Sequence, residues 1–139
     1  MLAEDIMTRD PLSVEDTTPM AEAFAVLAES DIRHLPVLRN EELVGIVSDR
    51  DFRGLGLSLV NDVKSFDDLR RRMGRGVSEL MSGSVISVDT DTPLSEVVDL
   101  FVEEKVGAIP VVEPGTAHLV GIISVLDMLR ASRETFERD

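Results

Sequence analysis

The sequence predicts an α+β fold made of two copies of a β-α-β-β-α unit that pack on each other, joined by a linker helix. Three observations predict it: the chain repeats itself, strand-like and helix-like segments follow in the same order in each copy, and 139 residues suffice for two small units but not for two large domains. We place the first repeat at residues 1–60, the linker helix at 61–78 and the second repeat at 79–139.

The duplication appears when the sequence is aligned with itself. Met7 falls on Met81, an offset of 74, and the offset becomes 76 after two extra residues in the second copy's loop. GIVSDRD at residues 45–51 and GIISVLD at 121–127 then share their Gly, Ile, Ser and Asp. Two copies are fewer than an open solenoid needs, so we expect them to close a shared core.

Each repeat opens with a short strand and a helix. PLSV at 11–14 and VISV at 85–88 favour a strand, and an acidic turn follows each. Thr18-Pro19 and Thr92-Pro93 predict a helix N-cap with proline at the first helical position. Apolar residues then recur at the three-and-four spacing of a buried helix face. They are Met20, Ala23, Phe24 and Leu27 in repeat one, and Leu94, Val97, Val98 and Phe101 in repeat two.

Two further strands and a second helix complete each repeat. The second of these strands is continuously apolar, which predicts burial on both faces, and its central glycine indicates close approach by a neighbour or ligand. The predicted strands are 35–38 and 42–48 in repeat one, and 109–112 and 118–124 in repeat two. The predicted second helices run from Asp49 to Leu55 and from Val125 to Ser132.

The linker contains a basic cluster, which has two interpretations. SFDDLRRRM at residues 65–73 predicts a solvated helix with acidic and basic side chains four residues apart. Arg70, Arg71, Arg72 and Arg75 form either an anion-binding patch or the favourably basic end of a surface helix.

The repeated S-x-x-D motif also has two interpretations. Ser48 with Asp51, and Ser124 with Asp127, fit a capping box, in which serine and acid each satisfy a free backbone N–H at the start of a helix. The same place suits a ligand, because a helix start is partly positive and a carboxylate accepts hydrogen bonds from both hydroxyls of a ribose. The two roles are compatible.

Taken together, these motifs resemble a tandem pair of CBS domains, the Bateman module. The resemblance spans residues 5–55 and 79–131. It implies a pseudo-twofold pair with two clefts that bind AMP, ADP, ATP or S-adenosylmethionine, with no other cofactor. It nominates Ser48, Asp51, Ser124 and Asp127 for the ribose and phosphate, and it nominates Pro11, Leu12, Leu35, Val85, Ile86 and Ile109 for the adenine walls.

The two repeats differ where a phosphate needs positive charge. Repeat one carries Arg33, His34 and Arg50, and repeat two has Gly107, Ala108 and Leu126 at the matching positions. In nucleotide-binding members of the family these positions contact phosphates, so the resemblance places the phosphate-binding potential on groups from repeat one. The alternatives are surface arginines paired with acids and a solvated histidine at a helix end.

Composition excludes several classes of function. The net charge of −13 opposes binding of nucleic-acid polymers, and no apolar run approaches the roughly 18 residues of a membrane span. With no signal peptide and no cysteine, we expect a cytoplasmic protein. The two histidines do not occupy corresponding positions in the repeats and give no metal site. The sequence contains neither a Gly-rich phosphate loop nor the spacing of an acid, a base and a nucleophile that a catalytic site needs.

Two functions therefore remain. The first is a non-enzymatic sensor that binds an adenosine ligand in the cleft between the repeats and signals to an unknown regulated protein. The alternative is a ligand-free dimerisation or interaction module in which the S-x-x-D motifs serve only as caps. The resemblance implies a homodimer in both cases.

Overall fold

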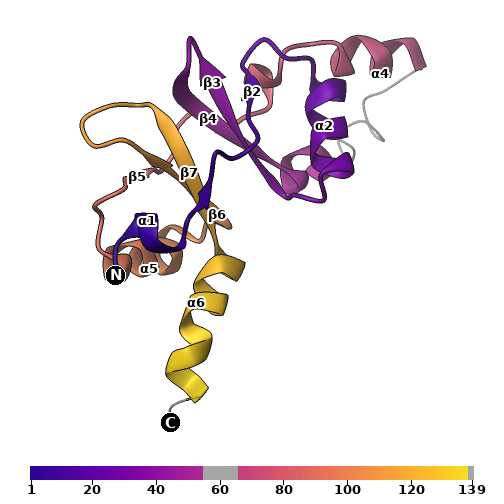
Figure 1. The fold of residues 1–139 in the computed structure, drawn as a ribbon. Helices are drawn as coiled ribbons and strands as arrows, with labels where there is room; N and C mark the ends of the chain where they lie inside the picture. Colours follow the sequence, from indigo (N-terminus) through magenta and orange to yellow (C-terminus); the bar gives the residue numbers. More distant parts are fainter. Residues whose placement is uncertain (55–65, 138–139) are drawn as a thin grey trace. The chain divides into compact units, whose positions relative to one another are not determined.

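The computed structural model describes residues 1–54 and 66–137 and divides the chain into two compact units (Figure 1). We call Leu12–Val85 the repeat-one unit; the repeat-two unit combines Met1–Pro11 with Ile86–Asp139. The units are thus not the same as the sequence repeats. The N-terminal segment packs with the second repeat, and the residues that lead into the second repeat pack with the first.

The repeat-one unit is built on a three-stranded sheet in the order β2-β3-β4. β2 runs parallel to β3, and β3 pairs antiparallel with β4. The strands are β2 (Val14–Glu15), β3 (His34–Arg39) and β4 (Glu42–Ser48). The helices are α2 (Met20–Glu29), a helix described over residues 49–54, α4 (Phe66–Met73) and the 3-10 helix η1 (Val77–Glu79).

The repeat-two unit has a four-stranded sheet in the order β1-β7-β6-β5. β5 is parallel to β6, β6 pairs antiparallel with β7, and β1 adds an antiparallel edge strand. The strands are β1 (Thr8–Arg9), β5 (Val88–Asp89), β6 (Ala108–Val112) and β7 (Leu119–Ser124). The helices are α1 (Ala3–Ile6), α5 (Leu94–Glu104) and α6 (Val125–Glu137).

The predicted α+β class and the repeated β-α-β-β-α order are confirmed, but several boundaries were wrong. The entry strands predicted at 11–14 and 85–88 shrink to β2 and β5, because only their last residue and the one after it pair with a neighbour. α6 continues five residues beyond the predicted Ser132. Leu55 and the predicted start of the linker helix at 61–65 lie outside the described residues.

The predicted threonine caps were also wrong. Pro19 and Pro93 occupy the N-cap positions of α2 and α5, and neither helix receives a side-chain cap. The first N–H of each helix instead donates to a backbone carbonyl of the segment that leads into the other repeat. Met20 N–H donates to Arg75 O at 2.9 Å in repeat one, and Leu94 N–H donates to Met1 O at 2.9 Å in repeat two.

A methionine packs against the glycine in the middle of β4 and of β7. Met81 covers Gly45, and Met7, its counterpart in the duplication, covers Gly121. A Cβ at either glycine would collide with the methionine side chain, and at Gly45 it would also lie 2.9 Å from Ser82 O. The close approach that the glycines predict is therefore made by a neighbouring segment in each unit.

Each unit has its own hydrophobic core between its sheet and its helices. Ala23 and Leu27 of α2 and Val97 of α5 are buried as predicted. Phe24 and its counterpart Val98 were predicted in the core but are 49% and 41% exposed, because they lie at the edge of the apolar face. Along β4, buried and half-buried residues alternate, so one face of the strand is less enclosed than predicted. Among the described residues, no helix is both long and apolar enough to cross a membrane.

Candidate functional site

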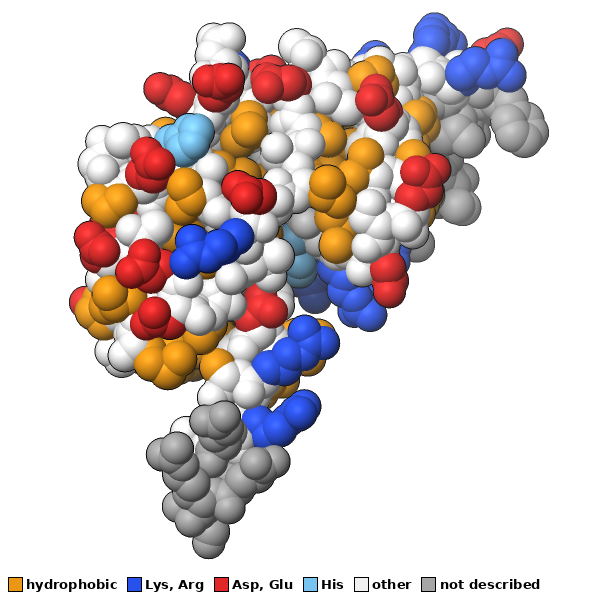
Figure 2. All heavy atoms as spheres, viewed as in Figure 1, with side chains coloured by type: hydrophobic (Ala, Val, Ile, Leu, Met, Phe, Trp, Pro, Cys, Tyr) orange, Lys and Arg blue, Asp and Glu red, His pale blue; other side chains and the backbone are white. Residues whose placement is uncertain are grey.

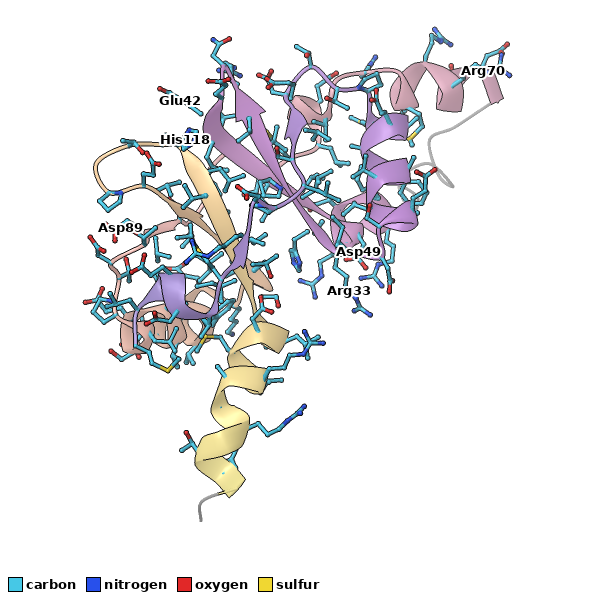
Figure 3. The ribbon with its side chains drawn as sticks, in the orientation of Figure 1. Arg33, Glu42, Asp49, Arg70, Asp89 and His118 are labelled. Atoms are coloured by element: carbon cyan, nitrogen blue, oxygen red, sulfur yellow. The ribbon has the colours of Figure 1, made fainter. Side chains whose placement is uncertain are left out.

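The candidate site of each repeat lies where the β-hairpin meets the second helix. In repeat one, β3 begins beside the end of β4, so that His34 is opposite Ser48, and Asp49 N–H donates to Arg33 O at 3.0 Å. Figure 3 shows Arg33 and Asp49 at this end of the repeat-one sheet. Hairpin register thus brings Arg33 and His34 beside the S-x-x-D motif, although more than ten residues separate them in the sequence.

Repeat two reproduces the same backbone arrangement. Ala108 is opposite Ser124, and Val125 N–H donates to Gly107 O at 3.1 Å. The positions of Arg33 and His34 are therefore occupied by residues without a charged side chain, while the backbone around them is retained.

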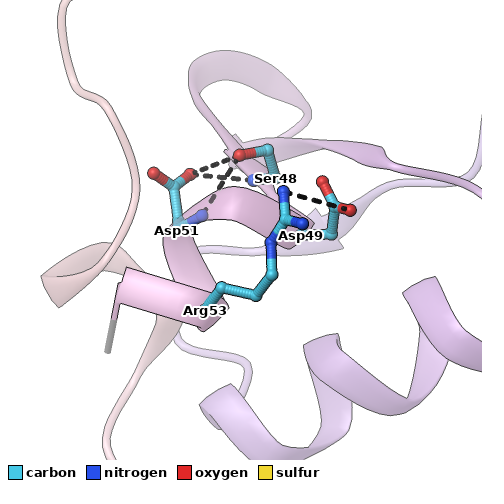
Figure 4. Close-up of polar contacts among 4 residues, drawn as sticks. All are labelled: Ser48, Asp49, Asp51 and Arg53. Atoms are coloured by element: carbon cyan, nitrogen blue, oxygen red, sulfur yellow. Dashed lines mark hydrogen bonds and ion pairs between the residues drawn. The ribbon is translucent and has the colours of Figure 1, made fainter. Parts of the chain in front are cut away.

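The capping-box interpretation of S-x-x-D is confirmed in repeat one. Ser48 N–H donates to Asp51 Oδ2 at 2.8 Å, and Asp51 N–H donates to Ser48 Oγ at 3.3 Å (Figure 4). The serine hydroxyl also donates to Asp51 Oδ2, at 3.2 Å. These reciprocal bonds fix the carboxylate at the start of the helix.

The same box closes in repeat two. Ser124 N–H donates to Asp127 Oδ2 at 2.8 Å, and Asp127 N–H donates to Ser124 Oγ at 3.1 Å. In both boxes Oδ2 accepts the capping bonds, and within the described residues Oδ1 of each aspartate accepts none. Each half-buried carboxylate therefore keeps one oxygen for another donor.

Charged side chains surround the box of repeat one. Arg33 and Arg50 are exposed, and neither guanidinium group makes a hydrogen bond or ion pair with another described residue. Sequence reasoning missed Asp49 and Arg53, whose carboxylate and guanidinium lie 3.8 Å apart (Figure 4). Their i,i+4 spacing was the signal that could have found this pair.

His34 is half-buried beside these charges. Burial lowers its pKa below the ordinary value, and Arg33 adds to that effect, while Asp49 and then Asp51 oppose it by favouring the charged imidazolium. The imidazole is therefore biased towards its neutral form.

The residues nominated for the adenine walls occupy different environments. Leu35 and Ile109 are 0% exposed and belong to the cores of their units, so their side chains offer no accessible surface. Leu12 is 51% exposed, and Pro11, Val85 and Ile86 are half-buried. The chain passes from one compact unit to the other at the Pro11–Leu12 and Val85–Ile86 bonds.

The arginines of α4 and of the segment that follows it have acidic neighbours. Arg70 lies 3.9 Å from Asp67, Arg71 contacts Asp68, and Arg75 lies 3.8 Å from Glu79. These pairs support the surface-helix interpretation over a free anion patch. Among the residues that the structure describes, no group of three or more His, Asp or Glu side chains could hold a metal ion.

This chain belongs to the CBS domain family. The family's profile, described as "CBS domain", matches residues 3–57 and 77–134, which makes the chain a tandem pair as the motifs indicated. The match confirms the resemblance and, with the fold, the Bateman-type architecture.

Similar proteins include both enzymes and dedicated CBS proteins. The chloroplastic CBS domain-containing protein CBSX2 of Arabidopsis thaliana is 31% identical, over 86% of this chain and 57% of that protein. A crystal structure of CBSX2 in complex with AMP has a TM-score of 0.80 at 28% identity and covers 96% of this chain and 97% of that one. A crystal structure of AcuB from Vibrio cholerae has a TM-score of 0.79 at 30% identity and covers 99% of this chain and 93% of that one.

An inosine-5′-monophosphate dehydrogenase of Thermoplasma acidophilum is 27% identical over 91% of this chain but only 22% of its own length. The chain thus spans about a fifth of the length of the first enzymes that it matches. What it shares with them is the CBS pair.

Proposed function

We propose that this chain is a non-enzymatic regulatory module that binds an adenosine ligand and passes its occupancy to a partner protein. The ligand is AMP, ADP, ATP or S-adenosylmethionine. Asp51 and Asp127 accept the ribose hydroxyls, while Ser48 and Ser124 hold these carboxylates in place.

The observation that carries this proposal is the unused oxygen of each capping carboxylate. A cap alone needs only Oδ2, and Oδ1 is left at a half-buried position at the start of a helix in both repeats. A ribose hydroxyl is a donor that would satisfy it. The AMP complex of CBSX2, at 28% identity over nearly the whole chain, supports the same ligand class.

Calorimetric titration of the purified chain with each of the four ligands tests the proposal. Asp51→Asn and Asp127→Asn are the informative variants, because the amide oxygen can still accept the serine N–H while the NH2 group replaces the acceptor that faces the ribose. We expect binding to weaken by about tenfold or more in the variant whose site is occupied.

Asp5→Asn is the matched control. Asp5 Oδ2 accepts Leu2 N–H at 2.7 Å in the same kind of capping contact, outside both S-x-x-D motifs. This variant should bind ligand as the unmodified chain does. Failure of all four ligands to bind at millimolar concentration would refute the proposal.

A second candidate function is a homodimeric interaction module that needs no ligand. Large apolar side chains are exposed on two helices of the repeat-two unit, and burying them would be favourable. They are Val98 and Val102 on α5, and Leu126, Leu129 and Phe136 on α6.

Sedimentation at tens of micromolar tests this candidate. We expect a dimer that Val102→Glu and Leu129→Glu each weaken, because a charge would have to be buried at the interface. Leu12→Glu, at an exposed apolar residue of the other unit, is the control. A monomer in the unmodified chain would rule out this candidate.

A further inference from the structure

We infer that the two capping boxes are coupled, and that the coupling runs mainly through residues 9–12, where the chain first crosses between its two units. The inference rests on the proposed function, because it states how occupancy of one box reaches the other. We call residues 9–12 the first passage and residues 83–86 the second passage. The two passages are equivalent in the duplication, and the chain crosses between its units within each of them.

The first passage begins on the strand that leads to the box of repeat two. β1 pairs antiparallel with β7, and Asp10 N–H extends this pairing by donating to Val120 O at 3.2 Å. β7 ends at Ser124, whose N–H donates to Asp127 in the second box. A displacement of β7 at the box is therefore passed through backbone hydrogen bonds to Asp10.

The first passage continues to the strands that lead to the box of repeat one. Three residues, 11–13, separate Asp10 from Val14, where β2 begins. β2 pairs with β3, and the first residue of β3, His34, lies opposite Ser48 of the first box. Hydrogen-bonded backbone thus connects one box with the other, apart from residues 11–13.

The backbone of the first passage has little freedom to absorb a displacement. The ring of Pro11 fixes its φ and restricts the residue before it. Asp10 has a φ of 47°, in the left-handed region that few residues with a side chain adopt, and its bond to Val120 O holds it there. Strained backbone of this kind persists only where its surroundings fix it.

The second passage is an internal control, because it is built more loosely. The last residue before it that bonds to β4 is Ser82, which exchanges bonds of 3.0 and 3.3 Å with Ile46. Five residues, 83–87, then separate Ser82 from Val88, where β5 begins. The first of them is Gly83, whose backbone has more conformations available than that of any other residue type. A displacement at the first box is therefore largely absorbed here.

Hydrogen exchange of backbone amides in the ligand-free chain is the first test. Asp127→Ala removes the cap of the second box and should speed exchange along β7. If the boxes are coupled, it should also speed exchange along β3, by about fivefold or more. Asp10→Gly keeps the left-handed φ available but frees the backbone, so in this background the effect on β3 should disappear.

Ser84→Gly is the matched control, because Ser84 is the exposed counterpart of Asp10 in the second passage. The effect of Asp127→Ala on β3 should persist in this background. Asp10→Asn controls for charge, since asparagine also tolerates a left-handed φ. The chain has 27 acidic residues, and acidic side chains are spread over the visible face (Figure 2), so the loss of one charge is a small change.

Three results of this experiment overturn the inference. They are no effect on β3 in the otherwise unmodified chain, an effect that persists with Asp10→Gly, and an effect that is lost with Ser84→Gly. Gly83→Ala should act in the opposite direction. A Cβ at Gly83 meets no atom within 4 Å, and the methyl reduces the freedom of the second passage, so the effect on β3 should grow.

AMP provides the second test. In Asp51→Asn the second box remains intact, and saturating AMP should slow exchange along β3 as well as along β7. Asp127→Asn gives the reciprocal measurement, which linkage requires to yield the same factor. Adding Asp10→Gly should confine the protection to the unit that binds AMP, without loss of binding.

The two tests separate the inference from the proposed function. AMP binding that protects only one unit of the chain overturns the inference and leaves the proposed function standing. Failure of AMP, ADP, ATP and S-adenosylmethionine to bind overturns the proposed function, and hydrogen exchange in the ligand-free chain still decides whether the first passage couples the boxes.

Discussion

The two strand-to-helix junctions have one backbone arrangement and two kinds of surface. Each has a serine–aspartate capping box with a 2.8 Å bond from the serine N–H, and each ties its helix to the start of the neighbouring strand. Between the box residues, however, repeat one has Asp49 and Arg50 and repeat two has Val125 and Leu126. The difference teaches that the same capping box closes whether the two residues inside it are charged or apolar.

The largest expected effect is a loss of stability when the central glycine of β4 is replaced, and it should exceed the loss at the central glycine of β7. Gly45→Ala should destabilise the chain by about 1–3 kcal/mol, because the new methyl meets both Met81 and the fixed Ser82 carbonyl. Gly121→Ala should cost less, because its three nearest atoms all belong to the flexible Met7 side chain. Urea unfolding measures both.

A second substitution in each unit sharpens this comparison. Met7→Ala should offset part of the cost of Gly121→Ala, whereas Met81→Ala should leave Gly45→Ala strained against Ser82 O, which accepts a backbone bond from Ile46 N–H. Equal rescue in the two units would show that the carbonyl is not the obstacle.

Replacing the capping aspartate should lower the stability of the chain by nearly the same amount in either repeat. Asp51→Ala and Asp127→Ala each remove a 2.8 Å bond to a helix-capping N–H, and we expect each to lower stability by about 1 kcal/mol. Thermal unfolding without ligand measures this cost. A markedly larger loss at only one aspartate would contradict the equivalence of the two boxes.

A smaller effect is expected at the hairpin turns, which the repeats build differently. Repeat one places Glu41 at φ 70°, a left-handed conformation that disfavours a side chain, whereas the loop of repeat two uses Gly115 at φ 75°. Glu41→Gly should therefore stabilise the chain by about 0.5 kcal/mol, after the entropy cost of glycine is subtracted. Glu42→Gly, in β4, should destabilise it.

The smallest effect concerns His34 and depends on pH. Burial lowers its pKa in the folded chain, so the unfolded chain binds the proton more tightly. Stability should therefore fall as the pH drops below about 6.5. His34→Gln should lose this part of the dependence, and His118→Gln provides the control. Identical pH profiles for His34→Gln and the unmodified chain would contradict the assignment to His34.

Local features were predictable from the sequence. The capping boxes join residues three apart, and the strands and helices follow the spacing of apolar residues, so each signal lies within one short segment. The alignment of the repeats also indicated where Arg33, His34 and Arg50 would differ from their counterparts. Hairpin register then placed them beside Ser48, as antiparallel pairing requires.

Predictions that depended on the path of the chain were less successful. The Thr-Pro pair before each helix predicted a threonine side-chain cap, but backbone carbonyl oxygens of residues distant in the sequence accept the first N–H of α2 and of α5. Leu35 and Ile109 were nominated for the adenine walls, but their side chains lie in the cores. Both outcomes depend on what packs against a segment, which its own pattern does not contain.

The sequence by itself determined the duplication, the order of strands and helices, and the two S-x-x-D boxes, because these rest on interactions between near neighbours. Only the tertiary structure decided that residues 1–11 pack with the second repeat and that Met81 packs on Gly45 of the first. Met7 and Met81 are equivalent in the duplication, and either could in principle cover either glycine. The choice follows from long-range packing of the leading segments, which no local pattern encodes.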